Sequence, residues 1–147
     1  MWGHYSSSHS GYCIGFHEDK LTEYLSQKFK NNLDIHDVQY TEKIPEVDLS
    51  KVGQSSYAKE TVIVRSSTKY SDWSYEKEKR FLIDGFSNQP LKIPSNIFKK
   101  LIFGYNADPK HIEEIIKICD RQYPEIKYYK AKPSLSAFEM VIKKYTS

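Results

Sequence analysis

Residues 101–122 have the sequence LIFGYNADPKHIEEIIKICDRQ, in which an apolar strand and an amphipathic helix follow one another directly. The apolar run from Leu101 to Tyr105 is typical of a buried strand. Asp108 followed by Pro109 is a typical helix start, because proline is tolerated at the first helical position and aspartate can accept hydrogen bonds from the first turn. The helix predicted over 110–122 places one stripe of side chains against the core: Ile112, Ile115, Ile116 and Cys119. The thiol in this stripe is expected to pack as a small apolar group.

Strands and helices also alternate along the rest of the chain. Strands are predicted by apolar alternation or β-branched composition over 11–16, 35–40, 73–83, 126–131 and 137–144, the last two forming a hairpin around residues 132–134. Helices are predicted over 18–29 and 57–67, although Thr61 to Val64 within the second has strand composition. This order predicts a mixed fold, α+β or α/β, with a single mixed sheet of about five or six strands and two or three helices.

The length and composition are those of one globular domain. The chain has 147 residues, of which 39% are hydrophobic and 28% charged, and this predicts a single domain over residues 1–147 with a substantial core. The net charge of +3 is dispersed, and the densest basic run, residues 77–80, is interrupted by acidic residues. No nucleic-acid partner is therefore expected.

The sequence also predicts a cytoplasmic protein. It contains no run of about 18 apolar residues, so neither a membrane span nor a membrane partner is expected. The residues from Met1 to Gly11 lack the apolar run of a signal peptide. Cys13 and Cys119 are accordingly expected to be reduced thiols.

A first cluster of candidate residues lies just before and within the strand predicted over 11–16. It comprises Trp2, His4, Tyr5, His9, Gly11 and Cys13, and because loops beside strands often hold sites, Trp2, His4, Tyr5 and His9 are candidate binding residues. With His17 the cluster offers zinc donors, but the spacing fits neither a Cys-pair knuckle nor the His pair of a helix. No metal site is predicted, and folding is expected to need no metal. The alternative is structural: the histidines donate to nearby backbone and Cys13 packs.

A second cluster is the run Trp-Ser-Tyr-Glu-Lys-Glu-Lys-Arg at residues 73–80. On a strand, Glu76, Glu78 and Arg80 would share one face, with the two carboxylates about 7 Å apart. Such a pair can perturb each other's pKa or flank a substrate hydroxyl, which makes Glu76 and Glu78 candidate catalytic residues. The favoured interpretation is a structural ion pair between Arg80 and Glu78. Trp73, Tyr75 and Arg80 are candidate binding residues.

These motifs together resemble a known family. They are Met-Trp-Gly-His-Tyr at 1–5 with His9, Gly11, Cys13 and Phe16, then Trp73-x-Tyr-Glu-x-Glu-x-Arg80, then Ile93-Pro94 with Ile102-x-Gly104. From Met1 nearly to its C-terminus the chain resembles bacterial domain-of-unknown-function family 2971. The resemblance implies an α/β fold and supplies no activity. It also implies that the chain is the C-terminal part of that domain, since members usually carry an earlier segment containing Asn-Asp-Pro.

Two functions fit these residues. The favoured one is a non-enzymatic binding or accessory module of a bacterial protein, without a cofactor, in which Trp2, Tyr5, Trp73 and Tyr75 make the contacts. The alternative is a nucleotide-handling transferase or hydrolase, faintly similar to the split-sheet ADP-ribosyltransferases, with nicotinamide dinucleotide as its first candidate substrate. Glu78 or Glu76 would then polarise a ribose hydroxyl, and His4 and Tyr5 would line the pocket. A shared site requires the strands around 11–16 and 76–83 to be neighbours, and the glycines at 11 and 15 favour that arrangement.

Overall fold

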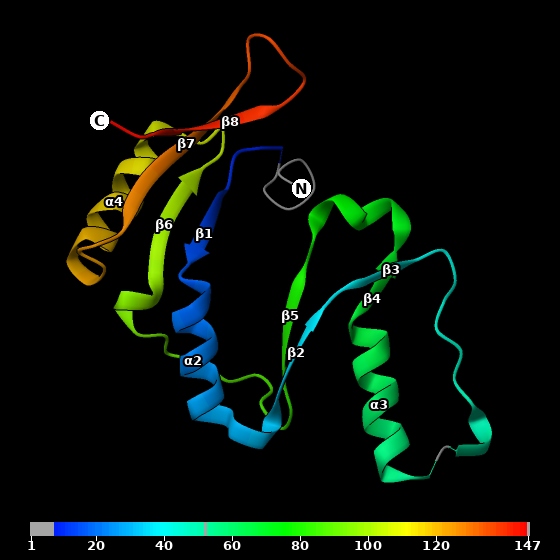
Figure 1. The fold of residues 1–147 in the computed structure, drawn as a ribbon. Coiled ribbons are helices and arrows are strands. Elements are labelled where there is room, and N and C mark those ends of the chain that lie inside the picture. The colour runs from blue at the N-terminus through cyan, green and yellow to red at the C-terminus, as the bar shows by residue number, and fades with distance from the viewer. Residues whose placement is uncertain (1–7, 52, 147) are drawn as a thin grey trace. The chain divides into compact units, whose positions relative to one another are not determined.

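The computed structural model describes residues 8–51 and 53–146, and these divide into two compact units. Unit 1 takes residues 8–24 and 90–146, and unit 2 takes residues 25–51 and 53–89. Figure 1 shows the elements of both units, which are described separately below. A single domain over residues 1–147 stays a prediction.

Unit 1 is built on a four-stranded mixed sheet in the order β1-β6-β7-β8. Its strands are β1 (Tyr12–Phe16), β6 (Phe98–Phe103), β7 (Lys127–Pro133) and β8 (Met140–Lys144). β6 pairs antiparallel with β1 and parallel with β7, and β7 pairs antiparallel with β8. The parallel pair is joined by helix α4 (Pro109–Gln122), as a parallel connection requires. A short 3₁₀ turn, η4 (Ser95–Ile97), precedes β6.

Helix α4 covers one face of this sheet, and the core of unit 1 lies between them. The buried residues are Leu101, Phe103, Ala107 and Ile112, with Ile115, Ile116, Cys119, Ile126, Tyr128 and Tyr145 packed around them. The side chain of Asp108 accepts a hydrogen bond from the Lys110 backbone N–H at 2.8 Å, and Pro109 follows it, so the predicted helix start is confirmed. Burial raises the pKa of the Cys119 thiol, with a further contribution from Asp120, so this cysteine is the packed thiol that the stripe predicted.

The segment before β1 lies directly against the end of β6. The backbone N–H of Gly104 donates to the carbonyl of Gly11 at 2.8 Å, and that of Asn106 donates to the carbonyl of His9 at 2.9 Å. A Cβ atom on Gly104 would lie only 2.0 Å from the His9 carbonyl oxygen. Residue 104 must therefore be glycine for this contact to form. The contact joins the motif that contains His9 and Gly11 to the motif Ile102-x-Gly104.

Unit 2 contains two small two-stranded sheets and one long helix. β2 (Leu33–Asp37) pairs antiparallel with β5 (Lys79–Ile83), and β3 (Gln39–Thr41) pairs parallel with β4 (Thr68–Tyr70). Helix α3 (Ser55–Ser66) connects β3 to β4. The 3₁₀ helices of the unit are η1 (Lys30–Asn32), η2 (Leu49–Lys51) and η3 (Ser71–Glu76). Helix α2 (Glu18–Phe29) begins in unit 1 and ends in unit 2, over the predicted residues 18–29.

The mixed α/β class is confirmed, but the strands are more numerous than predicted. The described residues contain eight strands in three sheets, together with three α-helices. The segment predicted as one strand over 35–40 forms the end of β2 and the beginning of β3. The two strands are separated by the buried Val38, whose N–H donates to the carbonyl of Glu78 at 2.9 Å. None of the helices among residues 8–51 and 53–146 combines the length and apolar character needed to cross a bilayer.

Two expectations about the second cluster are wrong. The predicted strand over 73–83 is a 3₁₀ helix up to Glu76 and a strand only from Lys79, because Lys77 adopts a left-handed conformation (φ 47°) that interrupts extended structure. The strands around 11–16 and 76–83 are not neighbours, since β1 pairs with β6 and β5 pairs with β2. The space beside Gly15 is filled by the side chain of Lys100 on β6.

Candidate functional site

The candidate site in unit 2 is an ionic network of Lys69, Glu76, Glu78 and Arg80. Lys69, on β4, donates hydrogen bonds from its Nζ atom to both carboxylates, reaching Oε2 of Glu76 and Oε1 of Glu78, the latter at 2.5 Å. Arg80, on β5, reaches the other oxygen of Glu78 with Nε at 2.8 Å and Nη2 at 2.7 Å. The two glutamates therefore converge as the sequence suggested, but on a lysine amine and not along one strand face.

Backbone hydrogen bonds hold this network in place. The Glu78 N–H donates to the phenolic oxygen of Tyr40 on β3 at 2.8 Å. The guanidinium of Arg80 also donates through Nη1 to the carbonyl of Ser66, the last residue of α3. A cation at the carboxyl end of a helix is stabilised by the partial negative charge there. Arg80 therefore connects the carboxylate pair to α3 and has a structural partner on each side.

Paired charges make Glu78 a very weak base. Its pKa is lowered from 4.5 to about 2, first by the hydrogen bond from Lys69 and then by Arg80 and Glu76. A carboxyl group with so low a pKa stays ionised at neutral pH, whereas an effective general base has a pKa near the working pH. The geometry thus favours the structural interpretation of Glu78.

Glu76 is the most deeply buried member of the network. Its side chain is 2% exposed, and one carboxylate oxygen is held by Lys69. The other oxygen, Oε1, is buried without a hydrogen-bond partner among the described residues. A buried carboxylate that depends on a single cation makes that cation important for stability.

The aromatic candidates of the second cluster lie beside this network on η3. The ring of Trp73 is 4.8 Å from the Lys69 Nζ atom, within the range of a cation–π contact. Trp73 and Tyr75 are neighbours with ring centroids 6.1 Å apart, and Tyr75 is 53% exposed. The structure therefore brings together Trp73, Tyr75, Glu76, Glu78 and Arg80.

The first cluster is not assembled into a site by the described residues. Trp2, His4 and Tyr5 lie outside them. His9 belongs to unit 1, where its backbone contacts the end of β6, and Cys13 is exposed on β1. In the part of the chain that the structure describes, no three His, Cys, Asp or Glu side chains are grouped closely enough to hold a metal ion.

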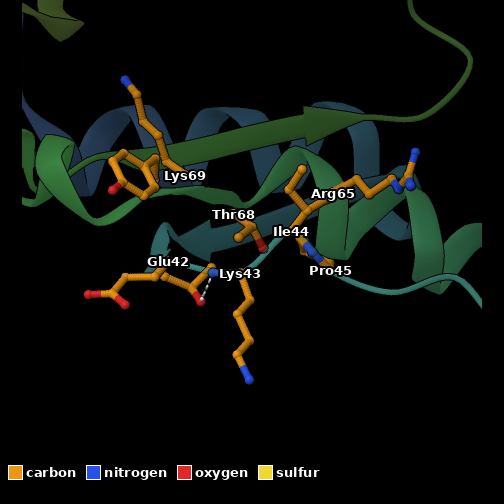
Figure 2. Close-up of a pocket in the computed structure, with 9 residues that line it drawn as sticks. Glu42, Lys43, Ile44, Pro45, Arg65, Thr68 and Lys69 are labelled. Carbon is orange, nitrogen blue, oxygen red and sulfur yellow. Dashed lines mark hydrogen bonds between the residues drawn. The ribbon is translucent and has the colours of Figure 1, made fainter.

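A cavity of about 320 Å³ opens beside the network, and Lys69 is one of its lining residues. Figure 2 shows that the charged ends of Lys43, Arg65 and Lys69 point in three different directions instead of converging. A phosphate group needs donors that meet at one point. The cavity does not present such a convergent set of donors in this structure. A larger cavity of about 710 Å³ between α3 and β5 is lined by apolar side chains such as Val62, Phe81 and Ile83 and also by the charged Asp34, Lys59 and Asp84. It contains no residue of the network.

Sequence reasoning missed the residue at the centre of the site. Lys69 precedes Glu76 and Glu78 on a different element, and no short-range spacing rule connects a lysine on one strand to carboxylates beyond a 3₁₀ helix. Tyr40 was likewise not predicted, because it contacts Glu78 from a distant part of the sequence. The only local signal for Lys69 was the alternating composition of residues 68–70, which is typical of a short strand.

The low pKa of Glu78 gives a prediction for acid unfolding. Because the folded-state pKa lies below the unfolded value, the ion pairs stabilise the protein above pH 4.5, and this stability is lost as the pH falls from about 4.5 towards about 2. Since 26% of the side chain remains exposed, we expect about 2 kcal/mol to be lost. Urea unfolding at stepped pH measures it, and the Glu78→Gln variant should lack this portion of the pH dependence. Parallel curves for both proteins would contradict the prediction.

Comparison with known proteins gives one family match. The family model described as "Protein of unknown function (DUF2971)" matches residues 1–81, more than half of the chain, and the matched segment ends within β5. The later motifs, Ile93-Pro94 and Ile102-x-Gly104, lie outside the matched residues, so the expected similarity extends less far than predicted. Neither the curated proteins nor the solved structures give a match.

Proposed function

The chain belongs to the DUF2971 family of proteins of unknown function, and from the site geometry we propose that it is a non-enzymatic binding or accessory module. One observation carries this proposal: Glu78, the best catalytic candidate, is held between Lys69 and Arg80 with its pKa lowered to about 2. Acid–base work at neutral pH is disfavoured by that environment. The charges then serve to support the neighbouring surface.

The supported surface is the aromatic segment on η3. Trp73 rests against the Lys69 amine, and Tyr75 packs against Trp73 while keeping half of its surface exposed. Aromatic side chains with an exposed face are enriched at binding surfaces, because they bury a large apolar area with little loss of conformational freedom. An ionic network beneath them fixes their backbone before a partner binds.

The alternative is a nucleotide-handling transferase or hydrolase that uses the Glu-x-Glu pair. The observation that favours it is the buried Oε1 atom of Glu76, which has an acceptor position open among the described residues. A ribose hydroxyl could donate to such an oxygen if the side chain moved to bring the buried atom to the surface. This reading requires Glu76, and not Glu78, to contact the substrate.

Both functions are tested on the full chain with nicotinamide adenine dinucleotide. We expect no release of nicotinamide above the buffer rate, measured by chromatography.

A photo-cross-linking residue at Tyr75 should capture a protein that the same residue at Tyr105 does not, the two positions being 53% and 50% exposed. Nicotinamide release that falls by a factor on the order of 100 or more in Glu76→Gln or Glu78→Gln would overturn the proposal in favour of the enzyme. Equal capture at both positions would also count against it.

A further inference from the structure

The connection between β7 and β8 carries two large apolar side chains that contact almost nothing. Leu135 and Phe138 have relative exposures of 105% and 113%. The loop is nevertheless ordered by its own hydrogen bonds: Ser134 N–H donates to the Glu139 carbonyl at 2.9 Å, and Ser136 N–H donates to Ser134 Oγ at 3.3 Å. In Figure 1 this connection extends as an open loop past the ends of the strands it joins. Apolar side chains held out in water in this way indicate a contact surface.

The strands that carry this loop are strongly basic. Between residues 127 and 144 there is one acidic residue, Glu139, against five lysines: Lys127, Lys130, Lys132, Lys143 and Lys144. Lys130 and Lys143 are directly paired across β7 and β8, so they share one face of the hairpin. Like charges in such a pair are destabilising. Among the described residues no carboxylate forms an ion pair with these lysines.

We propose that the β7–β8 hairpin docks on an anionic lipid surface. Leu135 and Phe138 would enter the boundary between headgroups and acyl chains, and the lysines of one hairpin face, Lys130, Lys132 and Lys143, would lie over the negatively charged headgroups. An anionic lipid surface accounts for both the exposed apolar side chains and the lysines. It removes Leu135 and Phe138 from water, and its headgroups supply negative charges for the lysines.

A lipid surface fits these features better than an acidic protein does. Leu135 and Phe138 lie in the connection between β7 and β8, which Figure 1 shows as a projecting loop. The soft boundary of a bilayer can receive such side chains without a preformed pocket. Lys130, Lys132 and Lys143 share one face of the hairpin and suit a broad charge better than a single carboxylate, whereas Lys127 and Lys144 lie on the other face. The inference concerns unit 1 and is independent of the aromatic surface proposed in unit 2. It departs from the expectation that the chain has no membrane partner.

Co-sedimentation of the full chain with vesicles tests the proposal. We expect the protein to sediment with vesicles of phosphatidylcholine containing phosphatidylserine, and to remain in solution with phosphatidylcholine alone. Two variants remove the proposed contacts, Leu135→Ser with Phe138→Ser, and Lys132→Gln with Lys143→Gln. The first should weaken partitioning by about tenfold or more, and the second by about 30-fold at low salt.

Matched controls on α4 separate a specific surface from a general effect. Ile118→Ser removes another exposed apolar side chain, 58% exposed, and Lys110→Gln with Lys117→Gln removes the same charge from exposed positions. These variants should bind as the wild type does. Failure of the wild type to sediment with the anionic vesicles would overturn the proposal, and so would equal losses in the control variants. Binding of an acidic protein without vesicle binding would assign the hairpin to a protein partner instead.

Discussion

Replacing Lys69 by methionine is expected to destabilise the protein by about 3 to 5 kcal/mol, because the change leaves two converging carboxylates without their shared cation. Most of the destabilisation comes from Glu76, since its side chain is 2% exposed and has no other hydrogen-bond partner among the described residues. The midpoint of urea unfolding at pH 7 measures the loss.

The matched control is Lys51→Met. Lys51 also pairs with a carboxylate, that of Asp48 at 3.3 Å, but their side chains are 53% and 47% exposed. Exposed pairs contribute no more than about 1 kcal/mol, so this variant should unfold almost as the wild type does. Adding Glu76→Gln to Lys69→Met should recover part of the stability, because it removes one of the uncompensated charges. Equal losses for the Lys69 and Lys51 variants would show that the network is not as buried as its geometry indicates.

Replacing Gly104 by alanine is expected to cost about 3 kcal/mol or more. The new methyl group would lie 2.0 Å from the His9 carbonyl oxygen. This oxygen belongs to the backbone, which cannot relieve the clash by changing rotamer as a side chain can. The segment before β1 would have to move, and the hydrogen bonds from Gly104 and Asn106 to it would be lost. Thermal and urea unfolding measure the effect.

The control for this change is Gly15→Ala. There the obstacle is the side chain of Lys100, whose Cγ atom lies at 2.7 Å and can be moved only by a change of χ1 that carries the whole side chain with it. We expect a smaller loss than for Gly104→Ala, about 1 to 2 kcal/mol, because a side chain and not the backbone has to move. A Gly104 variant as stable as the Gly15 variant would mean that the segment at 8–11 is not required in its present position.

Helices α2 and α4 could be predicted because each carries its own signals. α2 has acidic residues in its first turn and a lysine in its last, and α4 has a cap, a proline and an apolar stripe. Such signals lie within a few residues of one another, so a sequence displays them. The strand over 73–83 failed for the opposite reason: Lys77 ends η3 in a left-handed conformation that is rare for lysine, so its residue type gives no signal of the break.

Strand partners and the centre of the site could not be predicted for a related reason. The glycines at 11 and 15 correctly indicated close approach, but the approaching groups are the backbone near Gly104 and the side chain of Lys100. The predicted ion pair between Arg80 and Glu78 is present, because these residues are close in sequence. The lysine that completes the network comes from another strand, and only the folded chain brings it there.

The strand order of unit 1 also bears on how the protein is made. β1 pairs with β6, and the whole of unit 2 lies between them in the sequence. During synthesis β1 therefore leaves the ribosome long before its partner β6, and its residues Tyr12 and Ile14 stay on an unpaired strand until then. The elements β6, α4 and β7 can assemble from contacts that are local in sequence. Pairing of β1 with β6 has the highest contact order in the chain's main sheet, so it should be the late, slow step of folding and the stage at which nascent chains are most prone to aggregate.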